Sequence, residues 1–174
     1  MLLLIGESGS GKTTILNELI KKGFKQATNH TTRPKREGEG DEYQFVTKEE
    51  FERLWQEGEL LQRSEFNGEF YGISTTSLKE EVVAIQIVDS IKDVKARAQE
   101  LGLGDMKMKT FYIYVPAEER TKRMLERGDS IESIQKRLEI DKEKFKNVKE
   151  VADYIIENKE IEEAVEEIIK LYKN

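Results

Sequence analysis

The sequence predicts an α/β protein built on a doubly wound parallel sheet, and three observations lead to this fold class. Short apolar runs alternate with stretches of helical period along the 174 residues. The first run is followed at once by a glycine-rich turn and then by helix-forming residues. The runs lack polar alternation, which is typical of parallel strands buried on both faces. The expected strands are residues 2–5, 24–28, 82–89, 110–115 and 153–156.

Composition indicates a single domain over residues 1–174 with an acidic charge balance. Its 29 basic residues stand against 35 acidic ones, which gives a net charge of −6. This balance argues against non-specific binding to nucleic acid or to acidic membranes. The chain has no cysteine, which excludes disulfides and thiolate metal sites. It also has no apolar run of membrane-spanning length, and its start is too short for a signal peptide, so we expect a soluble cytoplasmic protein.

Residues 6–14 have the sequence GESGSGKTT and complete the pattern G-x-x-x-x-G-K-[ST] directly after the first strand. The glycines let successive backbone N–H groups turn inward around a phosphate chain, as in a P-loop. Lys12 reaches the β- and γ-phosphates, and Thr13 offers its hydroxyl to Mg²⁺. The helix expected at 14–22 directs its N-terminus at the polyphosphate. A plain glycine-rich turn is the alternative. The predicted ATP-binding residues of this loop are Gly6, Ser8, Gly9, Ser10, Gly11, Lys12, Thr13 and Thr14.

A polar stretch at residues 29–43 follows the second strand and is expected to be a loop, because it shows neither helical nor strand period. Two of its arginines, Arg33 and Arg36, stand three residues apart. Two guanidinium groups at this spacing suit a dianionic phosphate. A solvated charged loop explains the same residues without any ligand.

A small mixed lobe is predicted over residues 33–74, inserted between the core segments 1–32 and 75–174. Thr47 and Glu50 form a capping box that opens a helix. The predicted elements of the lobe are a strand at 43–46, the helix at 48–56 and two short strands at 60–66 and 69–72, with a hairpin turn at residues 67 and 68.

The core resumes with a short helix at 75–81 and a strand that ends on Asp89. Parallel sheets bind ligands at the carboxyl ends of their strands. Asp89 is therefore a candidate for contacting a substrate, or Mg²⁺ through a water molecule. Capping of the next helix, at 91–101, is an equally good interpretation of this residue.

Arginines cluster after the strand at 110–115, where Pro116 opens a further helix. Arg123 and Arg127 lie four residues apart on one helical face, and Arg137 follows beyond Gly128. Such a cluster can clamp phosphates during their transfer. Exposed pairs with the nearby glutamates 118, 119 and 126 explain the arginines equally well. The chain closes with the last strand, Asn158 and a helix at 161–172.

The chain resembles guanylate kinase over almost its whole length. The segments that carry the resemblance are GESGSGKTT, TTRPKREGEGDEYQF, FNGEFYG, ERTKRMLERGDSIESIQKRL and DYIIEN. The resemblance implies an ATP-binding core, an α+β lobe that binds a nucleoside monophosphate, and a short helical lid at about 127–141. It also implies a joint role for the arginines of the loop and of the lid, which their interpretation as solvated surface charges does not give.

The resemblance implies a role for individual side chains. Arg33, Arg36, Tyr43 and Tyr71 are similar to the residues that bind the acceptor phosphate. Lys12, Arg123, Arg127 and Arg137 are similar to the groups that neutralise the transferring phosphoryl, and Asn158 to a contact of the donor base.

Three residues depart from the family pattern where the acceptor base is recognised. Gln62 stands where the family uses a carboxylate, Ile73 where a hydroxyl is expected, and Asn29 where a serine is expected. An amide offers one acceptor and one donor, whereas a carboxylate only accepts. A shift of register would instead make Glu59 or Glu65 the carboxylate.

The resemblance thus implies ATP-dependent phosphoryl transfer to a nucleoside monophosphate, with Mg²⁺ as cofactor and GMP or dGMP as the leading acceptor. Another monophosphate such as AMP, IMP or dTMP, or a ribose phosphate, remains open as acceptor. A non-catalytic binding module of the same fold is the third interpretation, against which the intact Gly11, Lys12 and Thr13 argue.

Overall fold

A five-stranded parallel sheet forms the centre of the computed structural model, which describes residues 1–35, 43–66, 68–78, 82–85, 87–104 and 108–174. The glycine-rich loop follows the central strand. In spatial order, the strands are β2 (Lys25–Gln26), β7 (Val82–Ile85), β1 (Leu2–Ile5), β8 (Lys109–Tyr114) and β9 (Tyr154–Glu157).

Helices cover both faces of this sheet, which confirms the doubly wound fold. In β1, Leu2 and Leu4 pack on one face, against helices α1 (Lys12–Lys21) and α6 (Ile161–Lys173). Leu3 and Ile5 point to the other face, where they join the core that includes the apolar residues of α3 (Ile91–Glu100). Successive residues of a strand face opposite sides, so a strand covered on both faces is apolar throughout.

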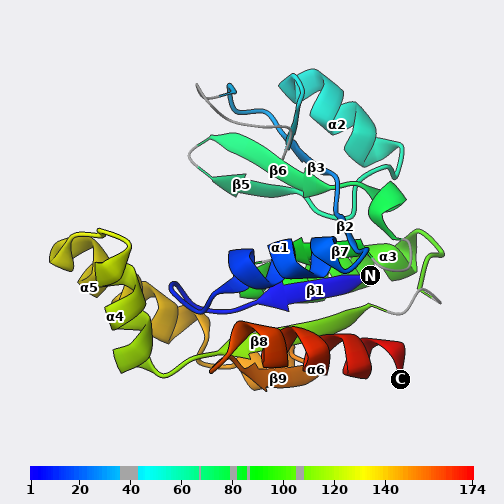
Figure 1. Ribbon diagram of the computed structural model, residues 1–174. Helices are drawn as coiled ribbons and strands as arrows, with labels where there is room; N and C mark the ends of the chain where they lie inside the picture. The colour runs from blue at the N-terminus through cyan, green and yellow to red at the C-terminus, as the bar shows by residue number, and fades with distance from the viewer. Residues whose placement is uncertain (36–42, 67, 79–81, 86, 105–107) are drawn as a thin grey trace.

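A second sheet of four strands forms a small lobe with one helix, and Figure 1 shows this lobe beside the central sheet. Its helix α2 (Lys48–Gln56) packs on a core of Phe51, Leu54 and Leu60. Thr47 caps this helix as expected, because its hydroxyl accepts a hydrogen bond of 3.1 Å from the N–H of Glu50. The strands, in order, are β4 (Tyr43–Phe45), β3 (Asn29–Thr31), β6 (Glu69–Ile73) and β5 (Ser64–Phe66).

The prediction of a loop at residues 29–43 is wrong for the first three of these residues, which form β3. This strand pairs in parallel with β4 and antiparallel with β6, and His30 and Thr31 are buried. The sequence Asn-His-Thr carries no apolar alternation, so only the pairing with two distant strands makes it a strand. Residues 36–42, which include Arg36, lie outside the described part of the chain.

The strand expected to end on Asp89 is shorter than predicted. It ends at Ile85, and Val88–Ser90 form a 3₁₀ turn that leads into α3. The N-cap of α3 is Ser90, so the capping role suggested for Asp89 is wrong. The helix expected at 75–81 is likewise a 3₁₀ turn at Thr75–Ser77, with residues 79–81 outside the described ranges.

Two further helices, α4 (Ala117–Glu126) and α5 (Ile131–Lys144), pack against each other and lie at the left of Figure 1, near the loop that leaves β1. Gly128 joins them with a φ of 93°, a left-handed conformation that favours glycine. None of the helices in the described ranges is both long and apolar enough to cross a membrane.

Candidate active site

The glycine-rich loop passes so close to its neighbours that Gly9 and Gly11 leave no room for a side chain. Gly9 and Gly11 have φ angles of 79° and 88°. A Cβ atom on Gly9 would lie 2.9 Å from the carbonyl oxygen of Arg120, and one on Gly11 would lie 2.6 Å from Nδ2 of Asn158. Both values are below ordinary contact distances. The loop therefore needs glycine here for its conformation and for its packing.

Lys12 bends back over this loop. Its Nζ donates hydrogen bonds to the carbonyl oxygens of Gly6, at 2.5 Å, and Glu7, at 2.9 Å. Burial lowers the pKa of Lys12 to about 8, while the nearby carboxylates of Asp141 and Glu7 act in the opposite direction. The ammonium is thus bound by neutral carbonyl groups. A phosphate that took their place would offer the ammonium a full negative charge.

A cavity of about 520 Å³ opens over the loop, and we call it the donor cavity. The structure brings together here the three arginines that the sequence singled out, from α4, from the turn after it and from α5. The residues that line the donor cavity include Ser8, Gly9, Gly11, Lys12, Thr13, Thr14, Arg123, Arg127 and Arg137.

Two of these arginines also form ion pairs. Arg123 Nε lies 3.1 Å from Oε1 of Glu119, and its Nη2 donates to the carbonyl oxygen of Asn158 at 3.2 Å. Arg127 pairs with Asp129, which raises the pKa of Arg127 and lowers the pKa of Asp129. Both sequence interpretations therefore describe part of the structure, because the same arginines line a cavity and pair with carboxylates.

Asn158, expected as a contact of the donor base, lies beneath the loop and is only 2% exposed. Its Nδ2 donates a hydrogen bond of 2.8 Å to the carbonyl oxygen of Ser10. Its Oδ1 is buried and has no hydrogen-bond partner among the described residues. In this structure the side chain therefore supports the loop.

A second cavity, of about 670 Å³, lies between the lobe and the core, and we call it the acceptor cavity. Five of the eight residues predicted to bind the acceptor line it: Asn29, Tyr43, Gln62, Tyr71 and Asp89. They come from the sheet of the lobe, from the loop before β5 and from the turn before α3, so the fold gathers residues that are far apart in the sequence.

Of the other three predicted acceptor residues, two lie in the described part of the chain. The guanidinium of Arg33 lies 5.1 Å from the centre of the Tyr43 ring, beside the acceptor cavity. Ile73 is 1% exposed and packs in the apolar core with Leu61 and Leu78. Arg36 lies outside the described residues, as noted above.

Gln62 lines the acceptor cavity although its side chain is almost buried, at 8% exposed. Its Nε2 donates to Oγ of Ser64 at 3.3 Å, and this hydroxyl donates in turn to the carbonyl oxygen of Tyr71 at 3.3 Å. The amide of Gln62 is thus oriented by β5 and β6, and its carbonyl oxygen needs a different partner.

The structure adds residues that the sequence did not identify as acceptor contacts. Ile87, Asp93 and Lys144 line the acceptor cavity together with Glu65, which the sequence allowed as a carboxylate. No motif marks Asp93 or Lys144, because α3 and the end of α5 come together only in the fold.

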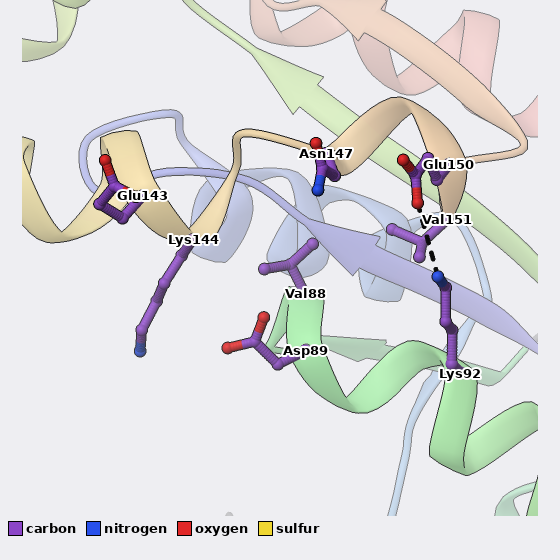
Figure 2. Close-up of a pocket in the computed structure, with 8 residues that line it drawn as sticks. All are labelled: Val88, Asp89, Lys92, Glu143, Lys144, Asn147, Glu150 and Val151. Carbon is purple, nitrogen blue, oxygen red and sulfur yellow. Dashed lines mark ion pairs between the residues drawn. The ribbon is translucent and has the colours of Figure 1, made fainter.

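A smaller cavity of about 290 Å³ adjoins the acceptor cavity, since Asp89 and Lys144 line both. Figure 2 shows the exposed side chains of Asp89, from the turn before α3, and of Lys144, from α5, reaching into it. On its far side, Lys92 and Glu150 form an ion pair of 3.6 Å. Asp89 therefore lies on the acceptor side and is not among the residues that line the donor cavity with Thr13.

Comparisons with known proteins show the family to which this chain belongs. The family model for guanylate kinase matches residues 1–174. This chain belongs to the guanylate kinase family. Guanylate kinase from Wolbachia sp. subsp. Brugia malayi is 34% identical over 176 residues, which cover 97% of this chain and 89% of the relative.

Two more members of the guanylate kinase family cover a similar share of this chain. The enzyme from Thermotoga maritima is 31% identical over 185 residues, with 100% of this chain and 86% of the relative covered. The crystal structure of guanylate kinase from Anaplasma phagocytophilum superposes with a TM-score of 0.66 at 24% identity, over 99% of this chain and 84% of that one. At that identity, the superposition supports the fold alone.

Proposed function

We propose that the protein transfers the γ-phosphoryl group of Mg·ATP to GMP or dGMP and so forms the nucleoside diphosphate. The observation that carries this proposal is the presence of two cavities in a chain of the guanylate kinase family. One combines the glycine-rich loop with three arginines, and the other combines the tyrosines and amides of the lobe.

Phosphoryl transfer asks little covalent chemistry of the protein. It requires in-line placement of the acceptor oxygen and neutralisation of the charge that spreads over the equatorial oxygens. Lys12, Arg123, Arg127 and Arg137 supply the cations around the donor cavity. The acceptor phosphate is already ionised at neutral pH, so no side chain has to act as a general base.

Mg²⁺ fits the donor cavity through the exposed hydroxyl of Thr13 and the oxygens of the nucleotide. Within the described residues, no three His, Asp or Glu side chains gather as a metal site of their own. Such a donor set suits Mg²⁺, which usually keeps several waters and binds phosphates with few protein ligands. The ion would neutralise negative charge on the transferring group.

On the acceptor side, Arg33, Tyr43 and Tyr71 would bind the monophosphate, together with Arg36. The base would then face Gln62 and Glu65, which line the same cavity. The carbonyl oxygen of Gln62 can accept the N1–H of guanine, and the Glu65 carboxylate can accept from its amino group.

The test is the initial rate of ADP formation with Mg·ATP and each of GMP, dGMP, AMP, IMP and dTMP. We expect GMP and dGMP to give the highest kcat/KM. Rapid turnover of another monophosphate beside undetectable turnover of both guanine nucleotides would contradict the proposal.

A different acceptor base is the second candidate, and the amide of Gln62 is the observation that favours it. Paired with Ser64, this amide can equally meet the N1 and N6 of adenine or the N3–H and O4 of thymine. A ribose phosphate would need no such base-reading group, and ribose-phosphate turnover without nucleotide turnover would identify it. Failure to bind Mg·ATP in calorimetry would instead support the non-catalytic module.

A further inference from the structure

Four polar side chains form a nearly buried cluster beneath the glycine-rich loop: Glu7, Tyr112, Arg120 and Asp141. The hydroxyl of Tyr112 donates to Oε2 of Glu7 at 2.7 Å. Arg120 lies between two carboxylates, with Nη2 3.6 Å from Oε1 of Glu7 and Nη1 3.5 Å from Oδ2 of Asp141. The side chains of Arg120, Glu7 and Asp141 are 8%, 12% and 11% exposed. Charges removed this far from water require good partners.

This cluster holds the backbone of the loop as well. The N–H of Ser8 donates to Oδ2 of Asp141 at 2.8 Å, and Nη1 of Arg120 donates to the carbonyl oxygen of Ser8 at 3.3 Å. Nε of Arg120 also donates a hydrogen bond of 3.1 Å to the carbonyl oxygen of Val115, which directly follows β8. The same loop residue is therefore bound by a side chain of α4 and by a side chain of α5.

The two helices carry phosphate-facing arginines close to these anchors. Arg120 precedes Arg123 by three residues in α4, and Asp141 follows Arg137 by four residues in α5. Residues at these spacings lie on neighbouring positions of one helical face. The bonds that Arg120 and Asp141 make to the loop therefore fix the position of the adjacent helical turn, which carries the arginine. Both arginines line the donor cavity.

We propose that Arg120 and Asp141 are positioning residues, which hold α4 and α5 against the loop so that Arg123 and Arg137 face the transferring phosphoryl group. The inference rests on the proposed function. Neither residue is among those that line the donor cavity, so both act through the arginines. A misplacement of about 1 Å in a reacting group can cost about 10²-fold in rate.

Three single variants test this role. Asp141→Asn keeps an acceptor for the N–H of Ser8 and removes the charge that faces Arg120, whereas Asp141→Ala removes both. Glu139→Gln, at an exposed position of the same helix, is the matched control. We expect kcat to fall by about tenfold in Asp141→Asn and by about 10²-fold in Asp141→Ala, with the KM for GMP unchanged. The control should behave as the wild type.

Affinity for nucleotide separates positioning from general damage to the loop. The arginines at 123 and 137 face the γ-phosphoryl group, so their displacement should weaken Mg·ATP more than Mg·ADP. Calorimetry should show the ratio of ATP affinity to ADP affinity falling by about tenfold in Asp141→Ala. An equal loss for both nucleotides would overturn the proposal.

A variant that replaces the ionic cluster separates positioning from stability. Buried ion clusters can often be exchanged for apolar residues without loss of stability. We expect Glu7→Gln/Arg120→Met/Asp141→Leu to unfold at a temperature close to that of the wild type. Its kcat should nevertheless stay low. Recovery of kcat together with stability would show that the cluster is only structural.

If this variant does not fold, the kcat of Asp141→Asn and the ratio of ATP affinity to ADP affinity decide whether the two residues position the arginines. A wild type that binds Mg·ATP but turns over neither GMP nor dGMP refutes the proposed function, and the affinity ratio then tests the inference alone.

Discussion

The donor and acceptor sides of the site are built in different ways. The donor cavity is organised by nine consecutive residues, 6–14, whose conformation is fixed by two glycines and by contacts to Asn158 and Arg120. The acceptor cavity takes its lining from the sheet of the lobe, from α3 and the turn before it, and from the end of α5. A function carried by consecutive residues can be read from the sequence, whereas one assembled from distant segments depends on the fold. Changes on the two sides should therefore have separable kinetic effects.

The largest expected effect is on the donor side, in Arg137→Ala. Removing one cation from a phosphoryl-transfer site can cost about 10³-fold or more in kcat. Arg123→Ala should have an effect of similar size. Rapid-quench measurement of product formation checks this, with Lys136→Ala as the control because Lys136 is exposed on the same helix. Turnover at the wild-type rate in Arg137→Ala would remove this residue from the mechanism.

The acceptor side should respond differently. We expect Gln62→Ala to raise the KM for GMP by about tenfold, the value of one hydrogen bond to a base, without changing the affinity for Mg·ATP. Steady-state kinetics and calorimetry measure the two quantities. Arg63→Ala is the neighbouring control, since Arg63 is exposed and pairs with Glu52. A loss of ATP affinity in Gln62→Ala would mean that the two sides are not separable.

The pH dependence of ATP binding sharpens the donor side further. Free protein loses the proton of Lys12 as the pH rises through about 8. Bound phosphates favour the charged ammonium and raise its pKa, so binding between pH 8 and 10 should take up a proton. Affinity should then fall by at most about tenfold per pH unit above 8. Calorimetry in two buffers of different ionisation enthalpy measures this uptake, and its absence at pH 9 would contradict the pKa assigned to Lys12.

The smallest effect concerns the stability of the acceptor lobe. His30 is the single histidine of the chain, and burial lowers its pKa below the ordinary 6.5. The unfolded chain therefore takes up the proton first, and stability from this residue is lost as the pH falls below about 6.5. Urea unfolding at pH 7 and pH 5 should show a smaller pH-dependent loss in His30→Gln than in the wild type. Equal losses would mean that His30 does not contribute.

The sequence predicted much of the fold because its local signals agreed with its tertiary structure. β1 reads as a strand covered on both faces, and Thr47 with Glu50 marks the start of α2. β3 could not be predicted, since its polar residues are ordered by pairing with β4 and β6.

The candidate site divides in the same way. The glycine-rich loop and its three arginines were identified from local motifs, and they line one cavity. The partnership of Arg120 with Asp141 was not visible, because the two residues lie 21 positions apart and no motif joins them. Asp89 was expected at the end of a strand and lies instead in a 3₁₀ turn, where it lines the acceptor cavity as one of the interpretations of the sequence allowed.

The central claim is that ATP and GMP occupy the two cavities together and that the phosphoryl group passes directly between them. Initial rates measured over a grid of ATP and GMP concentrations test it. The account predicts double-reciprocal lines that intersect, the pattern of a ternary complex. Parallel lines, which indicate a phosphorylated enzyme intermediate, or ADP release that does not depend on GMP would contradict it.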